Sequence, residues 1–120
     1  MSELSLTSNR KSYRQALDQT LKHIVVALAR RPEVKRAILF GSYADGRADL
    51  FTDLDILIVM DSPLDFVTRT AEMYRDLAGT VDMDLLVYTP EELERHQGRG
   101  FIRQILETGK VIYEQQVDGG

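Results

Sequence analysis

Two aspartates separated by one residue, Asp53 and Asp55, stand at the entrance to an apolar segment, residues 56–60. Side chains in a strand alternate between its two faces, so both carboxylates are expected on the same side. Neighbouring carboxylates repel each other, and a divalent cation between them removes that repulsion. The pair therefore predicts a metal site at the mouth of a buried strand.

A turn suited to phosphate precedes this pair. The apolar residues 37–40 predict the end of a buried strand, which breaks at Gly41 and Ser42, where the chain can turn tightly and present backbone N–H groups. A short helix expected to begin at Ser42 would direct further N–H groups at an anion. A phosphate-cradling turn and a carboxylate pair are components of two-metal sites for phosphoryl and nucleotidyl transfer.

A candidate third carboxylate lies on a later apolar segment, residues 81–88, which carries Asp82 and Asp84. Both are expected on one face of their strand, so side-chain alternation does not separate them. Asp84 lies deeper in the apolar run, where a buried carboxylate needs a compensating charge. We therefore favour Asp84 as the third acid, with Asp82 as the alternative.

Helices and strands are expected to alternate along the chain, which indicates an α/β layered fold. The helix expected over residues 64–78 should begin at Ser62-Pro63 and bury Val67, Ala71, Tyr74 and Leu77. The sequence Thr89-Pro-Glu-Glu predicts a capping box at the start of another helix. Apolar spacing and chain breakers predict the remaining elements: helices over residues 12–30 and 101–108, and strands over residues 34–40, 53–60, 81–88 and 110–114.

The composition of the chain predicts one globular domain spanning residues 1–120, with a core of about 12–114 and frayed ends. The absence of cysteine excludes disulfides and thiolate metal sites and fits a cytoplasmic location. We expect no membrane span and no signal peptide. The formal net charge of −4 argues against a dedicated nucleic-acid binder, because such proteins usually present a basic surface.

The two motifs together resemble the signature of the polymerase-β-like nucleotidyltransferase superfamily. The chain is most similar to its small stand-alone members, the minimal nucleotidyltransferases, over roughly residues 15–114. This resemblance implies a mixed β-sheet with helices packed on one side. It is carried by Gly41-Ser42-x-Ala44-x-Gly46, by Thr52-Asp53-x-Asp55 before an apolar strand, and by the later segments 84–92 and 109–114.

The resemblance also implies roles for the site residues. In the family, the paired carboxylates hold two Mg²⁺ ions, for which Mn²⁺ can substitute, and ATP or another nucleoside triphosphate is the substrate. Position by position, this makes Asp53, Asp55 and Asp84 the catalytic metal ligands. Gly41 and Ser42 would cradle the β- and γ-phosphates. Asp45 stands where relatives often carry a basic residue, so phosphate neutralisation is expected either to depend on Arg47 or to be weaker than in those relatives.

Two functions follow as expectations. The first is a metal-dependent enzyme that moves a nucleoside monophosphate, AMP from ATP, to a hydroxyl acceptor, for instance on a partner protein. The second is an antitoxin-like or regulatory subunit with a residual nucleotide site, paired with a small helical protein of the HEPN type. In either case we expect a homo-oligomer or a hetero-oligomer. Phe101 and Ile105 are candidates for that contact or, alternatively, for the core.

Overall fold

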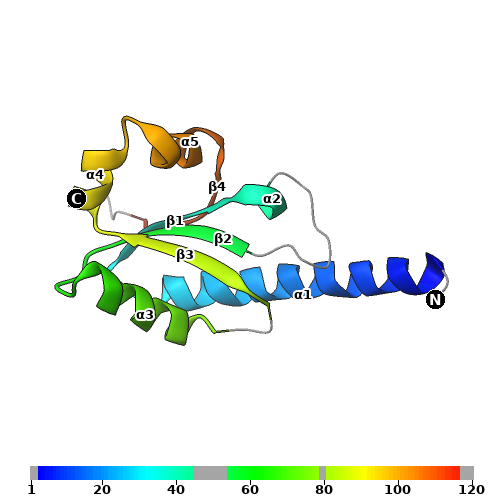
Figure 1. The fold of residues 1–120 in the computed structure, drawn as a ribbon. Helices are drawn as coiled ribbons and strands as arrows, with labels where there is room; N and C mark the ends of the chain where they lie inside the picture. The colour runs from blue at the N-terminus through cyan, green and yellow to red at the C-terminus, as the bar shows by residue number, and fades with distance from the viewer. Residues whose placement is uncertain (1–2, 45–53, 79–80, 117–120) are drawn as a thin grey trace.

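A four-stranded mixed sheet forms the centre of the molecule (Figure 1). The computed structural model describes residues 3–44, 54–78 and 81–116, and for residues 3–11, 13, 42 and 43 it describes the backbone alone. In chain order the elements are α1 (Glu3–Ala29), β1 (Val34–Phe40), α2 (Gly41–Ala44), β2 (Leu54–Met60), α3 (Phe66–Asp76), β3 (Met83–Tyr88), α4 (Pro90–His96), α5 (Gly100–Thr108) and β4 (Lys110–Glu114).

The strands lie in the order β3-β2-β1-β4. β1 pairs antiparallel with both β2 and β4, whereas β2 pairs parallel with β3, so the expected mixed sheet is confirmed. Six of the seven residues of β2 are buried, and Asp55 is the exception. Apolar residues on both faces of a strand are typical of an inner strand that is covered on both sides.

Helices cover both faces of this sheet. On one face, Leu54, Ile56 and Ile58 of β2 belong to a core cluster that also contains residues of α1 and α3. On the other face, Leu57 and Val59 pack in a second cluster with Leu93 of α4 and with Ile102 and Ile105 of α5. The expectation of helices on one side therefore holds for α1 and α3 and is wrong for α4 and α5. The physical reason is that β2 carries apolar side chains on both faces, so helices must shield both faces of the sheet from water.

The first helix is longer than expected. A start near Ser12 is predicted by the apolar stripe of this helix, which consists of Leu17, Leu21, Ile24, Val25 and Leu28. However, α1 begins at Glu3 and its N-terminal part extends past the sheet (Figure 1). The stripe itself is confirmed, because Leu17, Ile24 and Leu28 are completely buried against the sheet. Among the described residues, no helix combines the length and the apolar character needed to cross a bilayer.

The buried face of α3 differs from the prediction. Val67 and Tyr74 are exposed by 75% and 38%, Ala71 is also exposed, and only Leu77 is buried as expected. The helix begins after Asp65, whose side chain accepts a hydrogen bond from the Thr68 N–H group, rather than at Ser62-Pro63. Its buried face instead carries Arg69 and Met73. The prediction considered only apolar residues and so could not include a buried arginine. The face predicted to be buried is therefore rotated about the helix axis relative to the face that is buried.

Arg69 is buried because three partners satisfy its guanidinium group. Its Nε donates to the Val87 carbonyl and its Nη1 to the Leu64 carbonyl, both at 3.1 Å, and its Nη2 donates to the Glu92 carboxylate. Glu92 also accepts from the Thr89 backbone N–H at 2.8 Å, which confirms the predicted capping box. Arg69 thereby joins α3 to β3 and to the start of α4.

The Arg69 contact predicts an acid-sensitive contribution to stability. The hydrogen bond from Arg69, together with that from the Thr89 N–H, lowers the pKa of Glu92 from 4.5 to about 2. A carboxyl group with a lowered pKa in the folded state stabilises the fold above its unfolded pKa, and this contribution is lost as the pH falls. Between pH 4.5 and 2 the protein should therefore lose roughly 1–3 kcal/mol through Glu92. Urea unfolding at several pH values measures this loss. Glu92→Gln should lower the stability at pH 7 and flatten the pH dependence, and a variant as pH-sensitive as the wild type would contradict this assignment.

Candidate active site

Two carboxylates from different strands lie side by side on the sheet. The parallel register of β2 and β3 pairs Asp55 with Asp84. The neighbours of these residues, Leu54 and Ile56 on β2 and Leu85 on β3, belong to the core on the α1 side. Because side chains alternate along a strand, Asp55 and Asp84 both point to the α4 and α5 side. Asp55 is half-buried and Asp84 is exposed, so the pair lies where the sheet surface meets solvent.

Asp82 occupies a different kind of position. It precedes β3, its side chain is exposed, and its backbone carbonyl accepts a hydrogen bond from the Leu54 N–H at 3.1 Å. That bond sets the start of the pairing between the two strands. Of the two acids that the sequence left as alternatives, Asp84 is therefore the one in register with Asp55.

The glycine turn lies directly against Asp55 of this carboxylate pair. β1 ends at Phe40, which is the register partner of Asp55 on the other side of β2. Gly41 follows with a φ of +78°, and a Cβ atom at this position would lie 2.2 Å from the Asp55 Oδ2 atom. A residue with a side chain is strained at this φ and would also collide with the carboxylate. Glycine at this turn is therefore favoured by the positive φ, and any side chain there would displace the Asp55 carboxylate.

Several site residues predicted from the sequence cannot be placed. Asp53 and Arg47 lie outside the described residues, and the backbone of Ser42, but not its side chain, is described in α2. Among the residues that are described, no group of three or more His, Cys, Asp or Glu side chains could hold a metal ion. Asp55 and Asp84 nevertheless fit the expected ion, because Mg²⁺ takes carboxylate oxygens as ligands and these two carboxylates are adjacent.

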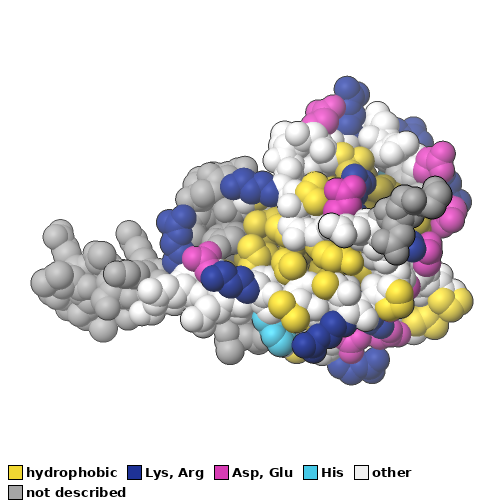
Figure 2. Space-filling model, turned by 180° about the vertical axis from the view of Figure 1, so that it is seen from behind, with side chains coloured by type: hydrophobic (Ala, Val, Ile, Leu, Met, Phe, Trp, Pro, Cys, Tyr) yellow, Lys and Arg dark blue, Asp and Glu magenta, His cyan; other side chains and the backbone are white. Residues whose placement is uncertain are grey.

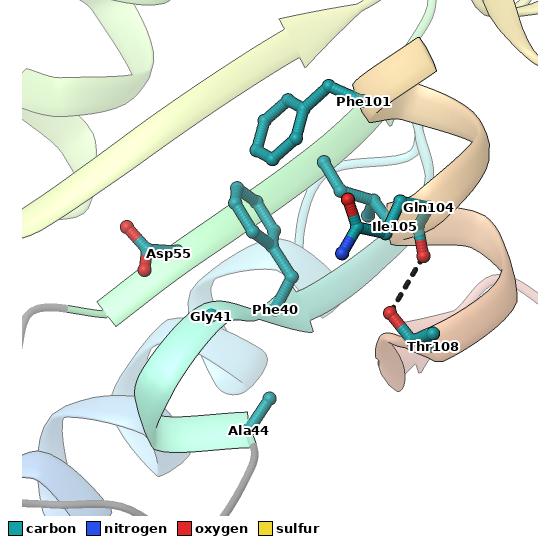
Figure 3. A pocket seen from close by; sticks show the side chains of 8 residues that line it. All are labelled: Phe40, Gly41, Ala44, Asp55, Phe101, Gln104, Ile105 and Thr108. Atoms are coloured by element: carbon teal, nitrogen blue, oxygen red, sulfur yellow. Dashed lines mark hydrogen bonds between the residues drawn. The ribbon is translucent and has the colours of Figure 1, made fainter. Parts of the chain in front are cut away.

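A pocket of about 290 Å³ adjoins Asp55. The end of β1, the turn into α2, and Asp55 form one side of it, and α5 forms the other (Figure 3). Asp55 lies at one end of the pocket and the α5 side chains at the other, with the Phe40 ring between them. The four lining residues from α5 have the spacing of a single helix face: Phe101, Gln104, Ile105 and Thr108.

Phe101 and Ile105 take different roles on this face. Ile105 is buried in the core, whereas Phe101 is 58% exposed and meets the Phe40 ring edge to face at a centroid distance of 5.6 Å.

The Thr108 hydroxyl donates to the Gln104 backbone carbonyl at 2.7 Å. Sequence reasoning missed Gln104 and Thr108 as site residues. Their sequence spacing could have indicated this role. Gln104 and Thr108 follow Phe101 by three and seven residues, which places them on the same helix face, the one directed toward the end of β1.

Comparisons with known proteins agree with this geometry. Residues 22–118 match the family model described as polymerase beta, nucleotidyltransferase. A Methanocaldococcus jannaschii protein named "Putative protein adenylyltransferase" is 35% identical over 98 residues, which are 80% of this chain and 97% of the relative. The solved structure of a putative nucleotidyltransferase from Sulfolobus solfataricus has a TM-score of 0.59 at 21% identity and covers 84% of this chain and 86% of its own.

A toxin–antitoxin structure with AMP-PNP is also similar, with a TM-score of 0.54 at 26% identity; the match covers 78% of this chain and 73% of that chain. The mixed sheet and the match to the family model define a nucleotidyltransferase. This chain belongs to the polymerase-β nucleotidyltransferase family.

Proposed function

We propose that this chain transfers AMP from ATP to a hydroxyl group on a partner protein, in a reaction that requires Mg²⁺. The observation that carries the proposal is the register pairing of Asp55 with Asp84 beside the Gly41 turn. The relative named as a protein adenylyltransferase and the toxin–antitoxin structure with AMP-PNP support an adenine nucleotide and a protein acceptor.

The proposed step is a displacement at the α-phosphorus of ATP. The acceptor oxygen forms a bond to that phosphorus, the bond to the oxygen that bridges to the β-phosphate breaks, and pyrophosphate leaves. Asp53, Asp55 and Asp84 would hold the Mg²⁺ ions, which stabilise the entering and leaving oxygens when bound. Gly41 and Ser42 would hold the β- and γ-phosphates, with Arg47 adding positive charge. The acceptor hydroxyl passes its proton to the Asp84 carboxylate, which faces solvent.

The acceptor would come from a second chain. Exposed large hydrophobic side chains occur on α1, α3, α5 and β4, and the most exposed are Val67, Phe101, Val111 and Val26. Figure 2 shows hydrophobic side chains gathered in the middle of the face it presents, with acidic and basic side chains interspersed around them. Exposed apolar area favours association with another protein. We therefore propose a hetero-oligomer with a small helical HEPN-type protein, or a homo-oligomer.

The alternative function is an antitoxin-like or regulatory subunit that binds the same partner without catalysis. The similarity to a toxin–antitoxin structure favours it. The two functions differ in one measurable property, which is covalent modification of the partner.

Transfer from ATP labelled at the α-phosphate tests the proposal. The protein is mixed with the product of its neighbouring gene, as the candidate partner, in the presence of Mg²⁺. Label should appear on the partner, resist denaturation, and be absent in EDTA. A stable complex in which neither protein is ever labelled would favour the binding subunit instead.

A further inference from the structure

We propose that the pocket between Asp55 and α5 holds the base of the nucleotide, with Phe101 as the stacking surface and Gln104 as the residue that reads the edge of the base. This inference rests on the proposed function, because it assigns one part of the ATP substrate to the side of Asp55 that lies away from Asp84.

The position of the pocket favours the nucleotide over the acceptor. Across the sheet the order of strands is β3, β2 and β1, so Asp84, Asp55 and the Phe40–Gly41 turn follow one another in that order. In the proposed reaction the acceptor hydroxyl gives its proton to Asp84, so the acceptor approaches from the Asp84 side of Asp55. The pocket lies on the opposite side of Asp55, against the β1 turn, and its lining residues do not include Asp84. The ligand that extends from Asp55 into the pocket is therefore the nucleotide.

The α5 side of the lining suits a base, whereas Gly41 on the opposite side belongs to the turn that would hold the phosphates. The described residues of the lining include two phenylalanines and no lysine or arginine. The contact between Phe40 and Phe101 is edge to face, with an interplanar angle of 82°, and more than half of Phe101 remains exposed. Nucleobases stack on such aromatic side chains in proteins that bind single-stranded nucleic acids. An exposed ring at the mouth of a cavity thus offers a planar surface to a planar ligand.

Gln104 supplies the polar recognition group. Its carboxamide carries both a donor and an acceptor, and a side chain of this type can pair with the edge of an adenine. Thr108 bonds to the backbone carbonyl of Gln104 and not to this carboxamide (Figure 3). The volume of about 290 Å³ is near the lower end of small-molecule pockets, about 300–1,000 Å³, and suits one nucleoside.

The test compares two ligands that differ in the base. The dissociation constants of ATP and of inorganic tripolyphosphate are measured by calorimetry with Mg²⁺, for the wild type and for Phe101→Ala. The variant should bind ATP about 10-fold more weakly, given the usual contribution of base stacking, and should bind tripolyphosphate as the wild type does. Phe101→Trp should retain ATP affinity, and Gln104→Leu should reduce the preference for ATP over CTP.

Phe66→Ala is the matched control. Phe66 is 40% exposed on α3, where it packs against Tyr88 and Arg69, away from the pocket. Its truncation should leave both dissociation constants unchanged. Thermal unfolding of each variant verifies that it is folded, and Phe101 tolerates truncation because most of its surface is exposed.

Three results would overturn the inference. If the wild type binds both ligands and Phe101→Ala alters neither affinity, the base lies elsewhere and the proposed function stands. If Phe101→Ala leaves ATP binding intact but raises the KM for the protein acceptor, the pocket holds the acceptor. If the wild type binds neither ATP nor tripolyphosphate, both this inference and the proposed function fail.

Discussion

Replacing Asp84 by asparagine is expected to lower the rate of AMP transfer by about 100-fold or more. Ligands of a catalytic metal act through several kcal/mol of transition-state stabilisation, and each 1.4 kcal/mol corresponds to a factor of ten in rate. The affinity for ATP should change far less, because Asp84 lies on the side of Asp55 away from the Gly41 turn that we propose holds the phosphates. The fold should be as stable as the wild type, since the substitution removes one of two like charges on neighbouring strands.

Asp82→Asn is the matched control for Asp84→Asn. It makes the same chemical change two residues earlier, at an exposed side chain that precedes β3. Its transfer rate should remain close to that of the wild type. Single-turnover rates and ATP dissociation constants for both variants separate chemistry from binding. The reverse ranking, with Asp82→Asn inactive and Asp84→Asn active, would refute the assignment of Asp84.

Replacing Gly41 by alanine is expected to reduce both stability and activity. The new methyl group would lie 2.2 Å from the Asp55 Oδ2 atom, so the carboxylate must move, and the φ of +78° is strained for alanine. The strain alone costs about 1–2 kcal/mol. A displacement of about 1 Å at a catalytic group can lower the rate by about 100-fold. Urea unfolding and the transfer assay measure the two effects.

Gly98→Ala is the control for this substitution. A Cβ atom at Gly98 would meet no heavy atom within 4 Å. This variant should match the wild type in both assays. If Gly41→Ala were equally stable and active, the close approach of the turn to Asp55 would have no part in the site.

The strands were predictable because each is a short apolar run between chain breakers. The bounds of β1 and β4 agree with the prediction, β2 ends at Met60 as expected, and β3 begins two residues later than expected. The helix at Thr89 was equally predictable, since its capping box depends only on residues that are close in sequence. Patterns among residues close in sequence were therefore sufficient to predict most of the helices and strands.

The pairing of Asp55 with Asp84 was beyond the reach of local patterns. Alternation along β3 gives Asp82 and Asp84 the same face, and only the register between two parallel strands distinguishes them. Register is a tertiary property, and so is the burial of Arg69, which depends on carbonyl groups and a carboxylate from three other segments. The pocket is also a tertiary property, because its walls come from β1, β2 and α5, and it could therefore not be predicted from the sequence.

The position of the label in ATP tests the central claim most directly. The wild-type protein and its partner are incubated with Mg²⁺ and with ATP labelled at either the α- or the γ-phosphate. A nucleotidyltransferase leaves the α-label on the acceptor and releases the γ-label in pyrophosphate. The account predicts that only the α-label is incorporated and that Asp55→Asn abolishes the incorporation. Incorporation of the γ-label, or α-labelling that persists in EDTA, would contradict it.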